Sequence, residues 1–139
     1  MSSLLEKLES VHGMSDTGNL NGLDYEFNPI PGEIEVVQVV FKDREELPIY
    51  LTQSESQMIC ICYLWDDDEV IPSKRAEMME VMLDMNIPIP LSSFGRIGSR
   101  YTIFGALSID SSVESIAKEL TVLSDNALDA IDAMSEYLN

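Results

Sequence analysis

The sequence predicts an α+β domain: an antiparallel five-stranded sheet with flanking helices, in the order α-βββ-α-ββ-α. Two observations carry this prediction. Segments rich in β-branched and aromatic residues follow one another across short polar turns, which is typical of antiparallel hairpins. Segments with apolar residues at helical spacing stand before, between and after these strands. The chain has 139 residues, 45% of them hydrophobic, so we expect a single domain over residues 1–139.

The first third of the chain predicts a helix, a loop and a strand. Residues 2–14 carry leucine and valine at helical spacing and predict a short amphipathic helix. Residues 13–32 are rich in Gly, Asn and Asp and hold two prolines, which favours a long irregular connection. Residues 33–41 are nearly continuous in apolar side chains, so both faces of this strand are expected to be covered.

Two more strands are predicted over residues 47–52 and 57–65, each entered through a charged or polar turn. In the first of them, Leu47, Ile49 and Leu51 are two residues apart and therefore share one face.

A second helix is predicted over residues 74–85, and Asn86 is expected to end it. Ser73 is expected to cap its N-terminus. Four of the eight methionines of the chain fall in this helix, and we expect Met79 and Met82 to lie in the core.

The rest of the chain predicts a hairpin followed by helices. Residues 91–109 form two strand-like segments that turn at Gly98 and Ser99. Gly105 inside the second segment indicates a close approach of backbone or a bulge. Apolar residues then recur at helical spacing, and the polar residues 124–126 are expected to break this helix and to cap a final one.

The chain is strongly acidic, with 25 acidic and 8 basic side chains and a formal net charge of −17. This argues against DNA, RNA and anionic membrane surfaces as direct ligands, because all three are polyanions. It favours a basic partner or simply solubility, and composition leaves both open. No signal-peptide pattern opens the chain and no apolar run has the length of a membrane span, so neither export nor membrane insertion is expected.

No catalytic constellation stands out. The single histidine, His12, has no predicted partner. Cys60 and Cys62 would share one face of a strand about 7 Å apart, too far for a disulfide, and buried, reduced thiols of a cytoplasmic protein are expected. Residues 66–69, "DDDE", lack the pattern of a calcium loop and predict a solvated loop, and "SFGRIGSR" is explained by a hairpin turn. We therefore expect no catalytic residue, metal or cofactor, and a binding role.

A row of carboxylates near the C-terminus is the clearest candidate for a binding surface. The stretch "SDNALDAIDAMSEYLN" spaces its four acids by four, three and four residues, which puts them on one side of a helix. Acids in a last turn oppose the helix dipole, so they do not stabilise the isolated helix. The row is either a solvated face or a docking surface for a Lys/Arg-rich helix, with exposed apolar side chains nearby. The expected partner-binding residues are Asp125, Asp129, Asp132, Glu136, Met134 and Tyr137.

Half of the basic residues cluster around the second helix and the hairpin: Lys74, Arg75, Arg96 and Arg100. They are expected to pair with acidic regions of the same chain or across a homodimer, and the sequence leaves both interpretations open.

Five segments together resemble the YjfI-like family, a bacterial domain of unknown function: "REELPIYL", "LWDDDEV", "IPLSSFGRIG", "YTIFGALS" and "VLSDNALDAIDAMSEYL". The resemblance runs from Val37 to Leu138 and is most specific in the closing stretch. The resemblance gives no catalytic residues to carry over to this chain. It implies that the protein is encoded beside a homologue of phage-shock protein A, a class of coiled-coil proteins that polymerise on stressed inner membranes. The order of elements is also similar to type III secretion chaperones and YbjN-like proteins, which bind polypeptides as dimers or adaptors.

These observations favour a cytoplasmic, non-enzymatic adaptor, chaperone-like in shape, that binds a basic helical partner of the phage-shock type through the row of carboxylates. One alternative is a small regulatory domain that holds an anionic metabolite between the sheet and the last helix through Arg44, Arg96 or Arg100. Another is a structural homodimer.

Overall fold

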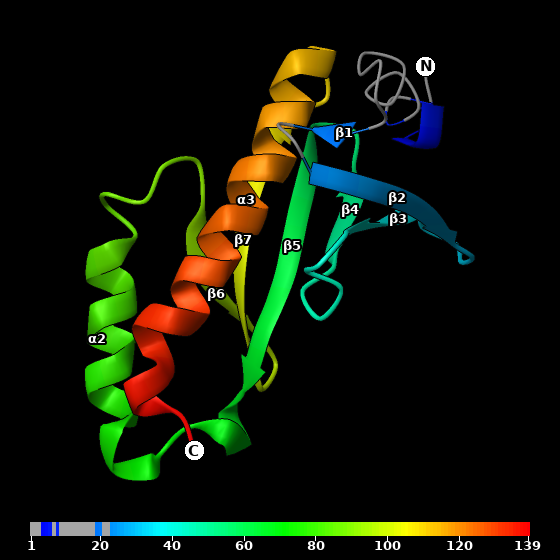
Figure 1. Cartoon of the computed structure of the whole chain (residues 1–139). Coiled ribbons are helices and arrows are strands. Elements are labelled where there is room, and N and C mark those ends of the chain that lie inside the picture. The colour runs from blue at the N-terminus through cyan, green and yellow to red at the C-terminus, as the bar shows by residue number, and fades with distance from the viewer. Residues whose placement is uncertain (1–3, 7, 9–18, 21–22) are drawn as a thin grey trace.

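The computed structural model describes residues 4–6, 8, 19–20 and 23–139 (Figure 1). In this part of the chain the strands form one sheet, paired antiparallel throughout, of order β1-β2-β3-β4-β5-β7-β6. The strands are β1 (Asn19–Leu20), β2 (Leu23–Ile30), β3 (Val36–Phe41), β4 (Ile49–Gln53), β5 (Gln57–Asp66), β6 (Ser93–Ile97) and β7 (Arg100–Ser108). The helices are α2 (Arg75–Met85) and α3 (Val113–Met134), and the 3₁₀ turns are η1 (Asp67–Glu69), η2 (Pro72–Lys74) and η3 (Ser135–Tyr137).

The predicted class, an α+β domain with an antiparallel sheet and flanking helices, is confirmed. The predicted number of strands is wrong, because the described residues form six strands of five or more residues, together with the two-residue β1. The additional long strand, β2, lies where an irregular connection was predicted over residues 13–32. Tyr25 of β2 is opposite Phe41 of β3, and the apolar side chains of β2 alternate with polar ones. This short alternation is typical of a half-buried strand at a sheet edge.

The described residues of the predicted first helix are helical and belong to the core. Leu4 and Leu8 are fully buried, and the backbone N–H of Leu4 donates to Glu35 Oε1 at 2.8 Å. The rest of that predicted helix, with His12, lies outside the described residues.

The core lies between the sheet and α3, which packs against β5 and β7 (Figure 1). Along β3, buried and partly buried side chains alternate, so only one face of this strand is fully covered. The prediction that both faces of residues 33–41 are covered is therefore wrong. Its apolar run reflects β-branched residues on both faces, and burial follows the side on which the helix packs.

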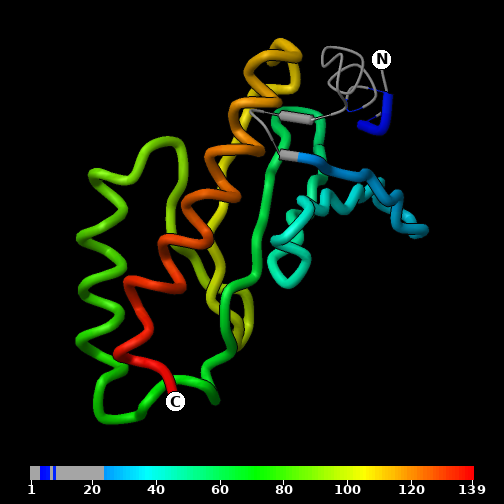
Figure 2. Tube along the Cα trace, viewed as in Figure 1, coloured from blue at the N-terminus to red at the C-terminus, as the bar shows by residue number. Residues whose placement is uncertain are grey.

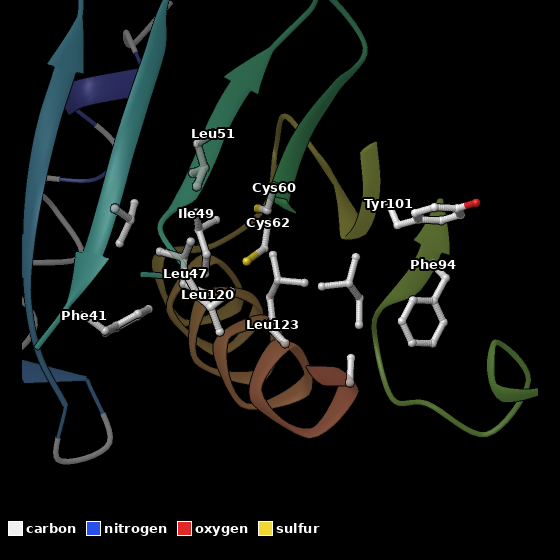
Figure 3. Packing of buried hydrophobic residues seen from close by; sticks show 14 of the residues in the cluster. Phe41, Leu47, Ile49, Leu51, Cys60, Cys62, Phe94, Tyr101, Leu120 and Leu123 are labelled. Carbon is white, nitrogen blue, oxygen red and sulfur yellow. The ribbon is translucent and has the colours of Figure 1, made fainter. Parts of the chain in front are cut away.

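Figure 3 shows the packing of this core. Leu47, Ile49 and Leu51 are at most 7% exposed and point the same way, which confirms their predicted common face. Cys60 and Cys62 on β5 lie near them, fully buried and unbridged. Burial raises the pKa of both thiols, that of Cys62 to about 12, so both stay protonated and unreactive near neutral pH, as expected of structural cysteines.

The helix α2 starts at Arg75, and the predicted cap at Ser73 is wrong. Ser73 lies inside η2, which has proline at its first position, and among the described residues no side chain caps the N-terminus of α2. Met82 is buried, which confirms its predicted place in the core. Met79 is only partly buried, because it also lines an open groove.

The helix α3 is continuous over 22 residues, so the predicted break at residues 124–126 is wrong. The polar side chains there make contacts to other parts of the chain and cap no helix. Asn126 Nδ2 donates to the carbonyl of Pro90 at 2.9 Å and lies 3.0 Å from Ser92 Oγ. The actual N-terminal cap is Ser112, whose Oγ accepts from the backbone N–H of Ser115.

The hairpin of β6 and β7 turns at Gly98 and Ser99, as predicted, and Gly98 has a φ of 60°. A close approach at Gly105 is also present, but the neighbour is the side chain of Glu119, not backbone. The irregular register lies elsewhere, between Tyr63 and Trp65 of β5.

After α3, the chain returns to the segment that precedes α2 (Figure 2). The backbone N–H of Ile71 donates to the carbonyl of Tyr137 at 2.8 Å, and Val70 forms an isolated β-bridge with Leu138. No helix in the described part of the chain has the length and apolar character needed to cross a lipid bilayer.

Candidate functional site

The four carboxylates predicted to form a row lie on the exposed side of α3 and η3, and we call them the acidic face: Asp125, Asp129, Asp132 and Glu136. Asp125 pairs with Arg44 at 2.7 Å between Oδ1 and Nη1. Among the described residues, no Lys or Arg side chain forms an ion pair with the other three carboxylates. Within the described residues, one carboxylate of the acidic face is therefore ion-paired and three are not, although Lys74 Nζ reaches the backbone carbonyl of Glu136.

The predicted exposure of Met134 and Tyr137 is wrong, since they are 1% and 5% exposed. Met134 continues the inner stripe of α3 that includes Ala127 and Ala130. Tyr137 turns inward because η3 folds back onto Ile71. Neither side chain is available to a partner in this structure.

A groove runs beside the acidic face, and we call it the α3 groove. It has a volume of about 410 Å³ and is lined by Glu46, Leu47, Leu64, Leu128, Ile131, Asp132 and Ser135. Its apolar side chains come from α3, from β5 and from the turn between β3 and β4. The two charged residues in the described part of its lining, Glu46 and Asp132, are both acidic, which disfavours the predicted alternative of an anionic metabolite held between the sheet and the last helix.

The wall of this groove is fixed by Arg44. Its Nη1 donates to Ser124 Oγ at 3.0 Å and to Asp125 Oδ1 at 2.7 Å, so the turn between β3 and β4 is tied to α3. The carbonyl of Arg44 also accepts from the backbone N–H of Leu47 at 3.0 Å. Of the three arginines considered for an anion, Arg44 is thus already engaged.

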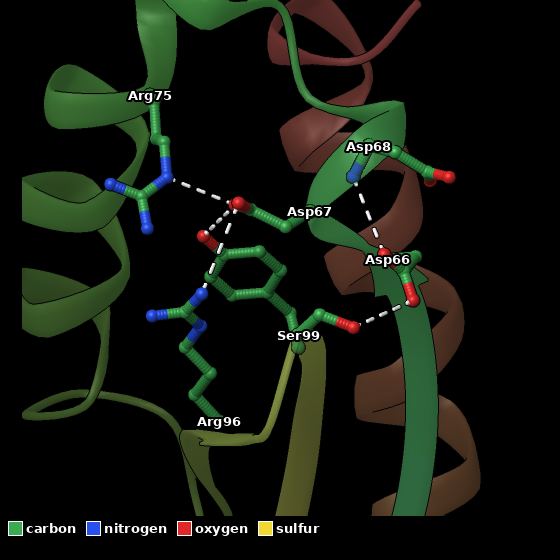
Figure 4. A network of polar contacts seen from close by, with 7 residues as sticks. Asp66, Asp67, Asp68, Arg75, Arg96 and Ser99 are labelled. Carbon is green, nitrogen blue, oxygen red and sulfur yellow. Dashed lines mark hydrogen bonds and ion pairs between the residues drawn. The ribbon is translucent and has the colours of Figure 1, made fainter.

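A second polar cluster centres on Asp67 (Figure 4). Asp67 Oδ1 accepts from Tyr101 OH at 2.7 Å and from Arg75 Nε at 2.9 Å, and Arg96 Nη2 lies 3.9 Å from Oδ2. These hydrogen bonds and the arginines hold the pKa of Asp67 below its ordinary value. The cluster joins η1 to α2 and to the β6–β7 hairpin, so the prediction of a merely solvated loop is wrong for Asp67.

The rest of the "DDDE" segment is also structural. Asp66 caps η1: its Oδ1 accepts from the backbone N–H of Asp68, and Glu69 Oε2 accepts from that of Asp66. Among the residues that the structure describes, no three His, Cys, Asp or Glu side chains group as a metal site would require.

The clustered basic residues make contacts within the chain. Arg75 and Arg96 approach Asp67, and the Arg100 guanidinium lies 4.0 Å from the centroid of the Tyr63 ring. Lys74 Nζ donates to the backbone carbonyl of Glu136 at 3.1 Å. This supports the intramolecular interpretation for Arg75 and Arg96, although their partner is Asp67 and not the acidic face.

A third feature is apolar, and we call it the α2 surface. It combines a groove of about 220 Å³ with four exposed large side chains. The groove is lined by Met79, Met82, Leu83, Asn86, Phe94, Gly95, Arg96 and Tyr101. The exposed side chains are Leu83 (68%), Ile87 (87%), Leu91 (52%) and Ile97 (46%). The methionines of α2 suit an adaptable apolar groove as well as a core, and the sequence favoured the core for Met79 and Met82. The exposed leucine and isoleucines were not predicted, and their signal was apolar residues on more than one side of α2.

Comparisons with known proteins bear on family and fold. The family model described as "Uncharacterized protein conserved in bacteria (DUF2170)" matches residues 5–138. The "Uncharacterized protein YjfI" of Escherichia coli (strain K12) is 33% identical over 103 residues, which are 71% of this chain and 76% of that protein. YjfI of Escherichia coli O157:H7 matches to the same extent. A chain of the crystal structure of the ExsC–ExsE complex has a TM-score of 0.60 at 11% identity and covers 91% of this chain and 92% of its own length.

Proposed function

This chain belongs to the DUF2170 family of uncharacterised bacterial proteins, as its resemblance to YjfI led us to expect, and we propose that it is a non-enzymatic, chaperone-like adaptor that binds a helical protein partner. The observation that carries the proposal is the acidic face, three of whose four carboxylates have no basic partner among the described residues.

The position of these charges supports a binding role. The last turn of α3 holds no basic residue, and Asp132 and Glu136 lie at the end of the helix where the dipole disfavours negative charge. Each costs a few tenths of a kcal/mol there. A surface that lowers the stability of its own helix is explained by an interaction with a positively charged partner.

The proposed partner is a helix rich in Lys and Arg. We extend the proposal to a partner of the phage-shock protein A type, bound in the cytoplasm. The reason is that the resemblance to the YjfI-like family implies a neighbouring gene for such a protein. The fold is compatible with this role, since the structurally similar ExsC–ExsE chain comes from a complex of two proteins. The buried, protonated thiols and the structural role of Asp67 favour binding over catalysis.

The test is affinity capture with the whole chain at about 0.05 M and about 1 M salt. The acidic face is neutralised in the variant D125N/D129N/D132N/E136Q, and the matched control D24N/E33Q/E55Q/D110N removes four exposed acids elsewhere. We expect the wild type and the control to retain a protein with basic helices that elutes at high salt, and the neutralised variant to lose it. Equal capture by both variants would overturn the proposal.

A second candidate, the structural homodimer, is favoured by the α2 surface. Met79 and Leu83 are four residues apart and therefore lie on the same side of α2, where Met79 is partly buried and Leu83 is exposed. Two antiparallel α2 helices related by a two-fold axis near Met79 would bring these two sides together. The exposed Leu83 would then be covered.

Light scattering after size-exclusion chromatography tests this candidate. We expect a dimer for the wild type and a monomer for Leu83→Glu. The control Ile34→Glu changes a residue of similar exposure (66% against 68%) far from α2 in sequence, and it should remain dimeric. A monomeric wild type would remove the candidate.

A further inference from the structure

We propose that the α3 groove receives the apolar side of an amphipathic basic helix, whose Lys and Arg residues then face the acidic face. This inference rests on the proposed function. The acidic face offers only charged contacts, and the α3 groove would supply the apolar ones. The two surfaces are continuous, because Asp132 belongs to both.

The floor of the groove is apolar and partly exposed. Leu128 and Ile131 are three residues apart on α3 and both are partly buried. Leu64 of β5 faces the same groove, and Leu47 closes its base at 7% exposure. A volume of about 410 Å³ lies within the range of roughly 300–1,000 Å³ typical of binding pockets, and apolar residues at i and i+3 or i+4 of a helix are the usual occupants of such a groove.

The charges of the groove select the occupant. Glu46 and Asp132 line it and both are exposed, and no Lys or Arg is among the described residues of its lining. Asp129 lies one turn before Asp132 on the exposed side of α3. A helix laid in the groove would thus meet carboxylates from α3 and from the turn before β4, which favours Lys and Arg on its flanks. Polyanions are disfavoured by the same charges.

The groove is already formed in the free chain. Arg44 ties the turn between β3 and β4 to Ser124 and Asp125, and Leu47 is held by a hydrogen bond to the carbonyl of Arg44. A preformed wall lowers the ordering cost of binding, so a modest apolar contact contributes more to affinity.

The experiment uses a fluorescent synthetic peptide of about 16 residues, made of Leu and Lys with the leucines at helical spacing. A peptide of the same composition with the leucines scattered around the helix is its control. We expect the amphipathic peptide to bind the wild-type chain at least roughly tenfold more tightly than the scattered one, as measured by fluorescence anisotropy.

Two variants of the chain test the groove itself. Ile131→Ser removes part of the floor, and Ser135→Trp fills the groove from an exposed position without removing a core side chain. Both should weaken binding of the amphipathic peptide roughly tenfold or more. The control Ile34→Ser changes an exposed apolar residue outside the groove and should bind as the wild type does. Circular dichroism checks that each variant folds. If Ile131→Ser does not fold, the affinity of Ser135→Trp alone tests whether the peptide binds in the groove.

The outcomes separate this inference from the proposed function. Suppose that both groove variants bind the peptide as tightly as the wild type, while the variant with the neutralised acidic face no longer binds it. The groove is then not the binding site, and the proposed function stands. If neither the groove variants nor the neutralised variant changes the affinity for the peptide, the inference about the groove and the proposed function are both overturned. Equal binding of the amphipathic and scattered peptides overturns the groove as well.

Discussion

The carboxylate of Glu119 on α3 occupies the space left by Gly105 on β7: a Cβ atom added at Gly105 would lie 2.6 Å from Glu119 Oε2. Glu119 is 2% exposed, and its Oε2 is buried with no hydrogen-bond partner among the residues that the structure describes. Desolvation raises the pKa of this carboxyl above its ordinary value. Its negative field also adds to the burial that raises the pKa of the Cys60 thiol on β5. The glycine therefore makes room for a polar side chain within the core.

Glu119→Gln is expected to stabilise the fold near neutral pH by about 1–3 kcal/mol, because it removes the charge of a buried carboxyl whose Oε2 has no hydrogen-bond partner in the described part of the chain. The pKa of Glu119 is higher in the folded state than in the unfolded state. Its contribution to stability is therefore fully present below the unfolded pKa and is lost as pH rises through the folded pKa. The wild type should lose stability relative to the variant as pH rises from about 4 to 8.

Urea unfolding of both proteins across that pH range measures this difference. The exposed Glu114 lies on the same helix, and Glu114→Gln removes the same charge without changing the core. The gap between wild type and Glu119→Gln should widen with pH. A gap that stays constant with pH, or one that Glu114→Gln reproduces, would show that burial of Glu119 has no energetic cost.

Gly105→Ala is expected to destabilise the fold by about 1–3 kcal/mol, because the new methyl group must displace the carboxylate of Glu119. In the background of Glu119→Ala the same change should cost much less, and a double-mutant cycle of unfolding free energies measures that coupling. Gly32→Ala is the control, since the nearest atom to its added Cβ lies 3.8 Å away. A similar loss of stability at Gly32 and Gly105 would contradict the proposed contact.

Much of the fold was predictable because its signals are local. Apolar residues two apart identify β4, a continuous apolar run bounded by polar residues identifies β5, and two glycine-containing segments identify the hairpin of β6 and β7. The continuity of α3 was not predictable in this way. Ser124 and Asn126 are common caps, but Ser124 contacts Arg44, 80 residues away, and Asn126 contacts Pro90. Such partners become visible only once the chain has folded.

The candidate site likewise has parts with a local sequence signal and parts that depend on residues distant in the sequence. The spacing of the acids places them on one side of α3, and their exposure is as predicted. The burial of Met134 and Tyr137 depends on η3 turning back toward Ile71, which no local sequence pattern indicates. The α3 groove needs Leu47 and Leu64 from two other elements beside α3, so periodicity within the helix alone does not reveal it.

The members of the acidic face are expected to contribute unequally to partner binding. Asp125 is already paired with Arg44, whereas Asp129 and Asp132 form no ion pair among the described residues. Asp132→Asn should therefore weaken binding of the basic amphipathic peptide more than Asp125→Asn does, by roughly three- to tenfold at low salt. Anisotropy titrations at about 0.05 M and about 0.5 M salt measure this, and the difference should shrink at the higher concentration. An affinity of Asp132→Asn equal to that of the wild type would argue against Asp132 as a direct contact.

Asp67→Asn is expected to lower the midpoint of thermal unfolding at pH 7, because Asp67 accepts hydrogen bonds from Tyr101 and Arg75. These bonds lower the pKa of Asp67 in the folded state. Its stabilising contribution is thus present above the unfolded pKa, about 3.9 for Asp, and is lost as pH falls through the folded pKa. Thermal melts from pH 7 down to about pH 3 should show the midpoints of wild type and variant converging.

Asp68→Asn is the matched control, since it removes the same charge from the neighbouring exposed residue. If Asp68→Asn lowers the midpoint as much, net charge and not the contacts of Asp67 accounts for the change.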